Sequence, residues 1–397
     1  MKKTKKIKIM KLINKPILIM MLIYALIGAF LILDASSISS VLTYGVDTYY
    51  FFKRQLIFIL IGLFGSLIIL RFPTKTYGKI SGLLSILFIG LTLAVYMKNK
   101  LFSTDVNDVA INLFGFSFQP GEFLKIFLVM YMASYYDSWI NNPKRKEWGF
   151  LWPLILCGAG VGIILLGGDF GTAALMLALF ALVFLSVPVK DKIITYFKSF
   201  AVFGLILCVV LLKYLYIVIP ETTLEQSYRL NRFVYKDPCD RYEKNSGYQV
   251  CNGYIAIDNG GLFGVGIGNS IQKYLYLPAS HTDFIFPIVV EELGLIVGVT
   301  IIIGYMVLIY LIFRISSQCT RFQNSMICYG VGIYITLHIF INLGGCLGII
   351  PLTGVQLPFL SYGGSYTLTL LFSMGLVQRV HYETYKKDNK KRKSTQQ

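Results

Sequence analysis

The chain has 397 residues, of which 55% are apolar and only 14% are charged, and its mean hydropathy is +0.65. Soluble domains carry about 25% charged residues, so this composition excludes an ordinary soluble domain and favours a membrane protein. The net charge of +17 does not indicate nucleic-acid binding. The basic residues lie in tails and short loops between apolar runs, where they hold cytoplasmic ends against anionic lipid.

Residues 1–15 form a lysine-rich tail, and the apolar run after them is too long for a signal peptide and lacks a small-residue cleavage site. A helix needs roughly 20 residues to cross about 30 Å of hydrocarbon. Ten apolar stretches of that length predict an all-α polytopic membrane protein with ten transmembrane helices; interruptions by Gly and polar residues leave nine or eleven open. The predicted helices begin near Pro16, Gln55, Gly78, Glu122, Gly149, Gly171, Phe197, Phe284, Asn324 and Leu357.

Basic residues gather on alternate connections, at positions 71–79, 144–146, 190–198 and 314–321, and in the C-terminal tail. The connections at 167–171 and 348–356 contain none. By the positive-inside rule both termini are predicted to be cytoplasmic, which requires an even number of spans. The expected organisation is therefore a basic tail (1–15), a ten-helix membrane domain (16–377) and a second basic tail (378–397).

One connection, at 220–283 between the seventh and eighth predicted helices, is much longer than the others. It is polar, rich in Gly and Tyr, and carries six Lys or Arg against seven Asp or Glu. Long loops of this kind are usually functional, and the parity of the spans makes this one extracytoplasmic. Cys239 and Cys251 lie in it and either form a disulfide or remain free thiols.

Two groups of polar residues lie at predicted helix starts. Pro120 favours a helix start after Gln119, so that Glu122 and Lys125 share one face at i,i+3. An ionised pair inside a span must face the protein interior or a wet cavity; a purely structural ion pair is the alternative. Asp169 lies in a tight outer turn, where a simple helix N-cap is the favoured interpretation.

The long loop holds further candidates. Arg229 and Arg232 lie beside aromatic residues, a pattern that suits a diphosphate because guanidinium binds phosphate oxygens in a fork, although solvated arginines are equally compatible. The glycines from 260 to 268, which precede Lys273, lack the βαβ context of a dinucleotide-binding site. They are expected to let irregular backbone pack against the bundle or approach a ligand.

Asp283 follows His281 and Thr282 where the polar loop meets the eighth predicted helix, which carries Glu291 and Glu292. Partial desolvation is expected to raise the pKa of the Asp283 carboxyl, which suits a general base; a carboxylate at a helix start beside a satisfied histidine is the alternative. The stretch 351–365 is neutral and broken by Gly and Pro, so it is expected to be buried in protein or to line a cavity.

Together these motifs resemble the bacterial FtsW/RodA/SpoVE family of shape, elongation, division and sporulation proteins. The resemblance covers about residues 34–365 and is strongest from 247 to 294, where GYQ, GGLFG, HTDFIF and EELG occur in the family's order. The elements QP-x-E-x-x-K, D-x-GTA, PLTG and LPF-x-SYGGS agree as well. The run that contains Arg232, followed by Asp-Pro and Gly-Tyr-Gln, resembles the division (FtsW-like) branch more than the elongation (RodA-like) branch.

The resemblance implies a ten-helix enzyme of the bacterial cytoplasmic membrane that polymerises lipid II into β-1,4 glycan strands, inverting the donor carbon. It implies that Asp283 is the catalytic base and that Arg232 and Lys273 neutralise the departing diphosphate. It places Glu122 and Lys125 in a central cavity. By position in the family motifs, His281 joins the substrate-binding set, and Gln119, Asp169, Gln249, Glu291, Glu292 and Ser361 join the cavity and structural set.

The implied partners are a class B penicillin-binding transpeptidase and other division or elongation proteins. The resemblance allows a divalent cation, Mg²⁺ or Mn²⁺, but no metal-ligand spacing in the sequence indicates one. The sequence departs from the family pattern at 107–112, where an Arg-Trp is absent, and at Gly121, Gly168 and Ala279. Two other functions compete with polymerisation: a lipid II flippase or other transporter, and a non-catalytic division scaffold.

Overall fold

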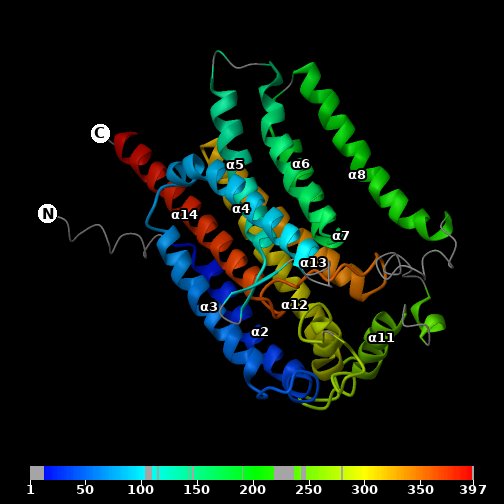
Figure 1. The fold of residues 1–397 in the computed structure, drawn as a ribbon. Helices are drawn as coiled ribbons and strands as arrows, with labels where there is room; N and C mark the ends of the chain where they lie inside the picture. The colour runs from blue at the N-terminus through cyan, green and yellow to red at the C-terminus, as the bar shows by residue number, and fades with distance from the viewer. Residues whose placement is uncertain are drawn as a thin grey trace.

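The computed structural model describes residues 13–102, 110–113, 116–142, 144, 147–189, 191–218, 237–242, 247–278 and 280–395. It is a bundle of long helices (Figure 1). The helices are α2 (Lys15–Leu42), α3 (Tyr50–Ile69), α4 (Thr74–Phe102), α5 (Pro120–Ile140), α6 (Leu151–Leu166), α7 (Phe170–Leu185), α8 (Lys192–Val218), α11 (Tyr248–Gly260), α12 (Ile285–Gln318), α13 (Phe322–Cys346) and α14 (Gly364–Thr395). Two short strands, β1 (Ile111–Leu113) and β2 (Phe116–Phe118), pair antiparallel before α5.

A helix lies at each of the ten predicted apolar stretches. The last of these helices begins later than predicted. Among the described residues, six segments are long and apolar enough to cross a membrane: α2, α3, α4, Glu147–Leu166, α12 and α13. The helix α7 is apolar but shorter. The last predicted helix is present, but its predicted start near Leu357 was wrong, because α14 starts at Gly364. Pro358 and the positive φ of Phe359 (65°) keep the preceding segment non-helical.

The start of α2, the turn before α4 and the later part of α14 lie together at one end of the bundle. The backbone N–H of Asn14 donates to Gln378 Oε1 (2.9 Å), and Thr74 Oγ1, at the start of α4, donates to Glu383 Oε2 (2.7 Å). The segments of the long loop and the start of α12 lie at the opposite end (Figure 1). The helices therefore run between a basic end and the end that carries the candidate site.

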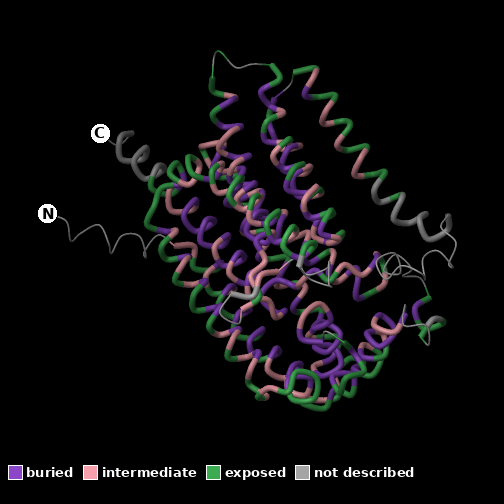
Figure 2. Tube along the Cα trace, viewed as in Figure 1, coloured by how far each residue is buried: buried purple, intermediate pink, exposed green. Residues whose placement is uncertain are grey.

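Large apolar residues lie on the outside of the bundle as well as in its core. Figure 2 colours the buried and exposed stretches of the chain. Leu26, Leu60 and Leu83 are at least 66% exposed, whereas Tyr136 and Tyr334 are fully buried. So many exposed leucines are unfavourable in water but not in hydrocarbon, because lipid tails are as apolar as leucine. The polar groups accordingly turn inward.

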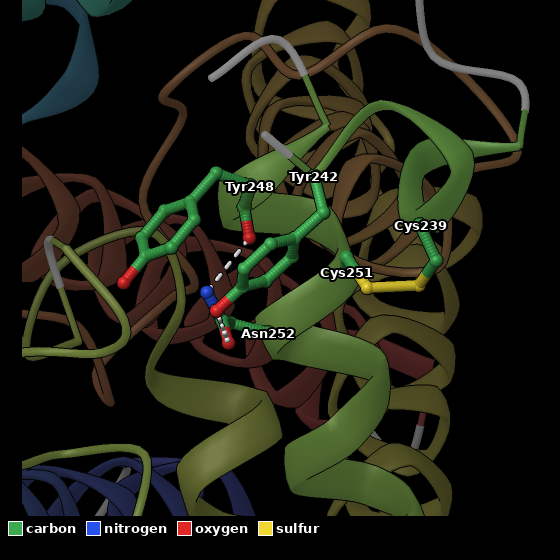
Figure 3. Close-up of a disulfide and its surroundings, with 5 residues drawn as sticks. All are labelled: Cys239, Tyr242, Tyr248, Cys251 and Asn252. Atoms are coloured by element: carbon green, nitrogen blue, oxygen red, sulfur yellow. Dashed lines mark hydrogen bonds between the residues drawn. A yellow bond between two sulfur atoms is a disulfide. The ribbon is translucent and has the colours of Figure 1, made fainter. Parts of the chain in front are cut away.

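The described part of the long loop is built around α11 and a disulfide (Figure 3). Cys239 and Cys251 are bonded, with their Cα atoms 4.9 Å apart, which decides between the two states that the sequence left open. Beside the disulfide, the ring of Tyr242 packs on that of Tyr248 at 4.9 Å between centroids, and Asn252 Nδ2 donates to the Tyr248 carbonyl (3.0 Å). The bond ties the segment that follows Asp237 to α11.

The glycine-rich segment after α11 packs its backbone directly on α12, as the sequence analysis expected. Gly264 (φ 80°) and Gly294 (φ 85°) face each other, and a Cβ on Gly264 would lie 2.2 Å from the Glu292 carbonyl oxygen. The N–H groups of Val265 and Gly266 donate to the carbonyls of Glu291 and Glu292 (2.9 and 3.0 Å). Only glycine fits at these two positions, because the two backbone segments touch there and both φ angles are positive.

Replacing Gly294 by alanine is expected to lower the free energy of unfolding by at least about 2 kcal/mol, since Ala is strained at positive φ and its Cβ would meet the Leu262 carbonyl oxygen at 2.3 Å. The midpoint of thermal unfolding in detergent measures this. Gly90→Ala, in α4 with no atom within 4 Å of the added Cβ, is the control. Equal unfolding midpoints for the two variants would contradict the prediction.

Candidate active site

Asp283 ends the segment that leads into α12 and is half-buried at the end of the bundle that carries the long loop. Its Oδ1 accepts a hydrogen bond from Thr282 Oγ1 (2.8 Å). Its Oδ2 faces Gly354, where an added Cβ would lie 3.7 Å away. Phe284, next in the chain, is fully buried. The carboxylate thus lies where the described loop meets the bundle core, and protein covers it only in part.

The backbone of Asp283 is held by α13, which the sequence analysis did not single out as part of the site. Asn342 Nδ2 donates to the carbonyls of both Asp283 and Val355 (2.8 Å each), and Cys346 Sγ donates to the Asp283 carbonyl (3.2 Å). The signal in the sequence is a stripe of polar residues every four positions on one helix face, from Tyr334 and His338 to Asn342.

His281 is buried and packs between aromatic rings rather than facing solvent. Its ring lies 4.5 Å from that of Phe51 and 5.8 Å from that of Tyr362, and its carbonyl accepts from the Tyr362 N–H (2.9 Å). Burial lowers the pKa of His281 to about 4, so the ring is neutral at pH 7. In this conformation it supplies no positive charge, and its role in substrate binding stays a prediction.

Lys273 is buried and its ammonium binds two carboxylates. Its Nζ donates to Glu292 Oε1 (2.7 Å) and Asp34 Oδ1 (2.9 Å). Burial opposes the charged form of Lys273, but these hydrogen bonds outweigh it and raise its pKa. The ammonium therefore joins α2, the loop and α12. Its predicted contact with a diphosphate remains a prediction, and Asp34 is a partner that the sequence analysis missed.

Glu291 holds the same loop from the neighbouring position. It is fully buried and accepts hydrogen bonds from Ser270 Oγ, from the N–H groups of Ile271 (3.2 Å) and Gln272 (3.3 Å), and from Asn259 Nδ2 (3.3 Å). These donors satisfy the hydrogen-bonding capacity of the buried Glu291 carboxylate. The structure thus gives Glu291 a structural position, as expected.

Glu122 and Lys125 form the expected ion pair inside the bundle. Both are buried on α5, with Lys125 Nζ 2.7 Å from Glu122 Oε1. Glu122 also lines a small cavity of about 30 Å³ with Gln119 and Asp169, which brings three predicted residues together. Asp169 is the N-cap of α7, with its Oδ1 accepting from the Thr172 N–H (2.9 Å), so the N-cap interpretation is confirmed.

The remaining candidates have separate positions. Ser361 is buried, and its Oγ accepts from the Leu357 N–H (2.8 Å), which closes the turn before α14. Gln249 is half-buried in the first turn of α11. Arg232, with the rest of 219–236, and Ala279 lie outside the described residues. Arg54 is a cation that the sequence analysis missed; its guanidinium lies 4.2 Å from the centroid of the Tyr50 ring.

In the described ranges, no three His, Cys, Asp or Glu side chains form a group that could hold a divalent metal ion. The pair Asp34 and Glu292 lies on either side of Lys273. The Lys273 ammonium already bonds to both carboxylates, so this pair is not free to ligate a metal ion.

Comparison with known proteins supports one family. The family model for FtsW, RodA and SpoVE, described as "Cell cycle protein", matches residues 14–386. The chain is 33% identical to the "Probable peptidoglycan glycosyltransferase FtsW" of Bacillus subtilis, over 92% of this chain and 90% of that protein. It is 34% identical to the protein of the same name from Coxiella burnetii, over 90% and 93% of the two chains.

Solved structures share the fold. A chain from a structure titled "Structural coordination of polymerization and crosslinking by a peptidoglycan synthase complex" matches with a TM-score of 0.68 at 21% identity, covering 94% of this chain and 98% of that one. The rod shape determining protein RodA of Thermus thermophilus matches with a TM-score of 0.63 at 20% identity over the same shares. The protein is therefore a multi-pass membrane protein, and the chain belongs to the FtsW/RodA/SpoVE family.

Proposed function

We propose that this protein is a peptidoglycan glycosyltransferase that polymerises lipid II into β-1,4 glycan strands. The observation that carries the proposal is Asp283, a half-buried carboxylate whose backbone is fixed by Asn342 at the end of the bundle that carries the long loop. The similarity to relatives named probable peptidoglycan glycosyltransferases, over about nine-tenths of the chain, supports it.

In the proposed reaction, Asp283 removes the proton from the 4-hydroxyl of the acceptor GlcNAc. The freed oxygen forms a bond to C1 of the donor MurNAc, the bond from C1 to the lipid diphosphate breaks, and the diphosphate leaves with the electron pair. Attack from the opposite face inverts C1 and gives the β linkage. Positive charge near the leaving group would stabilise the charge that develops there. We assign this role to Arg232, with Lys273 as the second cation.

The proposed topology has ten spans, both termini in the cytoplasm, and the reaction on the outer face of a bacterial cytoplasmic membrane. The meeting of Asn14 with Gln378 at one end of the bundle supports a common side for the two termini. The cationic turns near that end support the cytoplasmic assignment. The disulfide at the other end supports an oxidising compartment for the loop.

We further propose that the protein works with a class B penicillin-binding transpeptidase, within the assembly that builds the division wall. Structural similarity to a chain from a peptidoglycan synthase complex is the support for such a partner. The names of the relatives favour division over elongation.

A flippase and a non-catalytic scaffold are the alternatives. A flippase is expected to hold its charged substrate site near the middle of the bilayer. Asp283 precedes α12 at one end of the bundle, which favours chemistry at a membrane face.

Asp283→Asn is expected to lower the rate of lipid II polymerisation by the purified protein by about 10²- to 10⁴-fold, because the amide cannot accept the proton. Chain-length analysis of the glycan product, with and without the transpeptidase, measures the rate. Asp258→Asn, which changes an exposed carboxylate on α11, is the control and should polymerise normally. Polymerisation by Asp283→Asn at the wild-type rate would refute the proposed mechanism, and lipid movement without glycan product would favour the flippase.

Asn342→Ala is expected to lower kcat at least about tenfold with little change in KM, because the buried Val355 carbonyl loses the amide that donates to it, the Asp283 carbonyl keeps only the weaker Cys346 Sγ–H donor, and Asp283 is held less firmly. The matched control is Asn324→Ala. Asn324 is a buried amide on the same helix at the opposite end, where it donates to Glu383 Oε2 (3.1 Å). Both variants should lose similar stability, and an equal loss of kcat in both would show that Asn342 acts only through the fold.

The topology is tested with single cysteines and a thiol reagent that cannot cross membranes, in a chain whose unpaired cysteines are replaced. Asp47→Cys, in the exposed connection after α2, should react in intact spheroplasts, whereas Lys144→Cys, in the connection after α5, should react only after lysis. The reverse pattern would overturn the proposed orientation.

A further inference from the structure

The segment 260–278, between α11 and the approach to Asp283, exposes an unusual number of large apolar side chains. Phe263 is 81% exposed, the highest value among the large apolar residues described. The other large apolar residues that are exposed in this segment are Leu262, Val265, Ile267, Ile271, Tyr274, Leu275 and Tyr276. Contiguous apolar surface of this kind marks a contact with another molecule or with a membrane.

The polar side chains of the same segment are buried at Ser270, Gln272 and Lys273, whereas Asn269 is exposed. Its one charged residue, Lys273, is buried between Asp34 and Glu292. Ser270 is fully buried, donating its hydroxyl to Glu291 and its N–H to Glu292 Oε1 (3.3 Å). Apart from Asn269, which donates to the Val265 carbonyl (3.0 Å), the segment is thus polar inside and apolar outside, the reverse of a loop that faces water.

The backbone contacts fix the level of this segment along α12. The N–H groups of Leu295 and Ile296 donate to the carbonyls of Gly261 and Leu262 (2.9 and 3.3 Å). Gly294 interrupts the helix at that level, and the part that follows it, as far as Gln318, is about 36 Å long at 1.5 Å per residue. That length matches one crossing of about 30 Å of hydrocarbon. Gly294 and the segment beside it therefore lie at the level where α12 enters the membrane.

The exposed surface of the segment also continues that of α12. Leu295, Ile296, Val299 and Ile303 are each more than 40% exposed and form the outward face of the spanning part. Leu262 is joined to the first turn of this face through its backbone carbonyl. An apolar surface that runs without an exposed charge from the spanning helix onto the loop is continuous with the lipid-facing surface.

We infer that residues 260–278 form a membrane-seated loop, with Phe263 and Ile267 inserted among lipid acyl chains at the boundary with the headgroups. Tyr274 and Tyr276 suit this depth, because tyrosine rings collect at membrane interfaces. The inward Glu291, Glu292 and Lys273 hold the loop against α12 from the protein side. The inference depends on α12 crossing the bilayer and is independent of the proposed glycosyl transfer.

The test places a genetically encoded, environment-sensitive fluorescent amino acid at position 263 of the full chain in phosphatidylglycerol–phosphatidylethanolamine nanodiscs, with no partner protein present. Insertion about 5–10 Å into the headgroup and acyl boundary predicts emission at shorter wavelength than in water. It also predicts stronger quenching by lipids brominated near the top of the acyl chain than by lipids brominated near its end. Phe263 packs against little of the protein, so the replacement leaves the fold intact.

The matched control is the same amino acid at position 258, an exposed position on α11. It is expected to give water-like emission and little quenching by either lipid. Water-like emission at position 263 in the nanodisc would overturn the inference. A shift at position 263 that occurs only after a transpeptidase is added would also overturn it, because the surface would then be a protein interface.

Discussion

The Lys273 ammonium, enclosed between Asp34 and Glu292, joins three parts of the chain that are far apart in sequence: the outer part of α2, the glycine-rich loop and the first turns of α12. A buried ammonium is costly unless it is paired and hydrogen-bonded, and here both carboxylates meet it at hydrogen-bond distance. Removal of Lys273 would leave two neighbouring carboxylates without a cation. The loop is consequently fixed against the bundle where it leads to Asp283.

A second set of contacts begins where that loop ends. Asn342, on α13, binds the backbone of Asp283 and of Val355, so one amide group connects the approach to α12 with the non-helical segment before α14. Two stretches that the chain separates by many residues are thus held by a side chain of α13. The side chain of Asp283 stays half-exposed, because its fixation uses backbone atoms. A fixed backbone with a partly exposed side chain suits a group that must be rigidly placed and still reach a substrate.

The bilayer explains why the polar groups at this end turn inward. Glu291, Glu292 and Ser270 satisfy one another and the loop backbone, while Phe263 and its neighbours face outward. In water this arrangement would be unfavourable, but at a membrane boundary it places each kind of surface in its preferred solvent. The same rule accounts for the buried pair Glu122 and Lys125 in the first turns of α5.

The sequence by itself determined the helical class, the approximate helix positions, the ion pair of Glu122 with Lys125 and the N-cap at Asp169. Each depends on composition or on spacings of a few residues, which local geometry converts directly into structure. The family resemblance added Asp283 as the candidate base. The late start of α14 was missed because apolarity alone does not distinguish a buried, proline-broken segment from a helix.

Only the tertiary structure decided which residues meet across the chain. Asp34 lies 239 positions before Lys273, and Asn342 lies 59 positions after Asp283, so no local pattern pairs them. The disulfide between Cys239 and Cys251 and the burial of His281 were likewise decided by the fold. The physical reason is that these contacts depend on how helices pack against one another, and periodicity within a single helix carries no information about its neighbours.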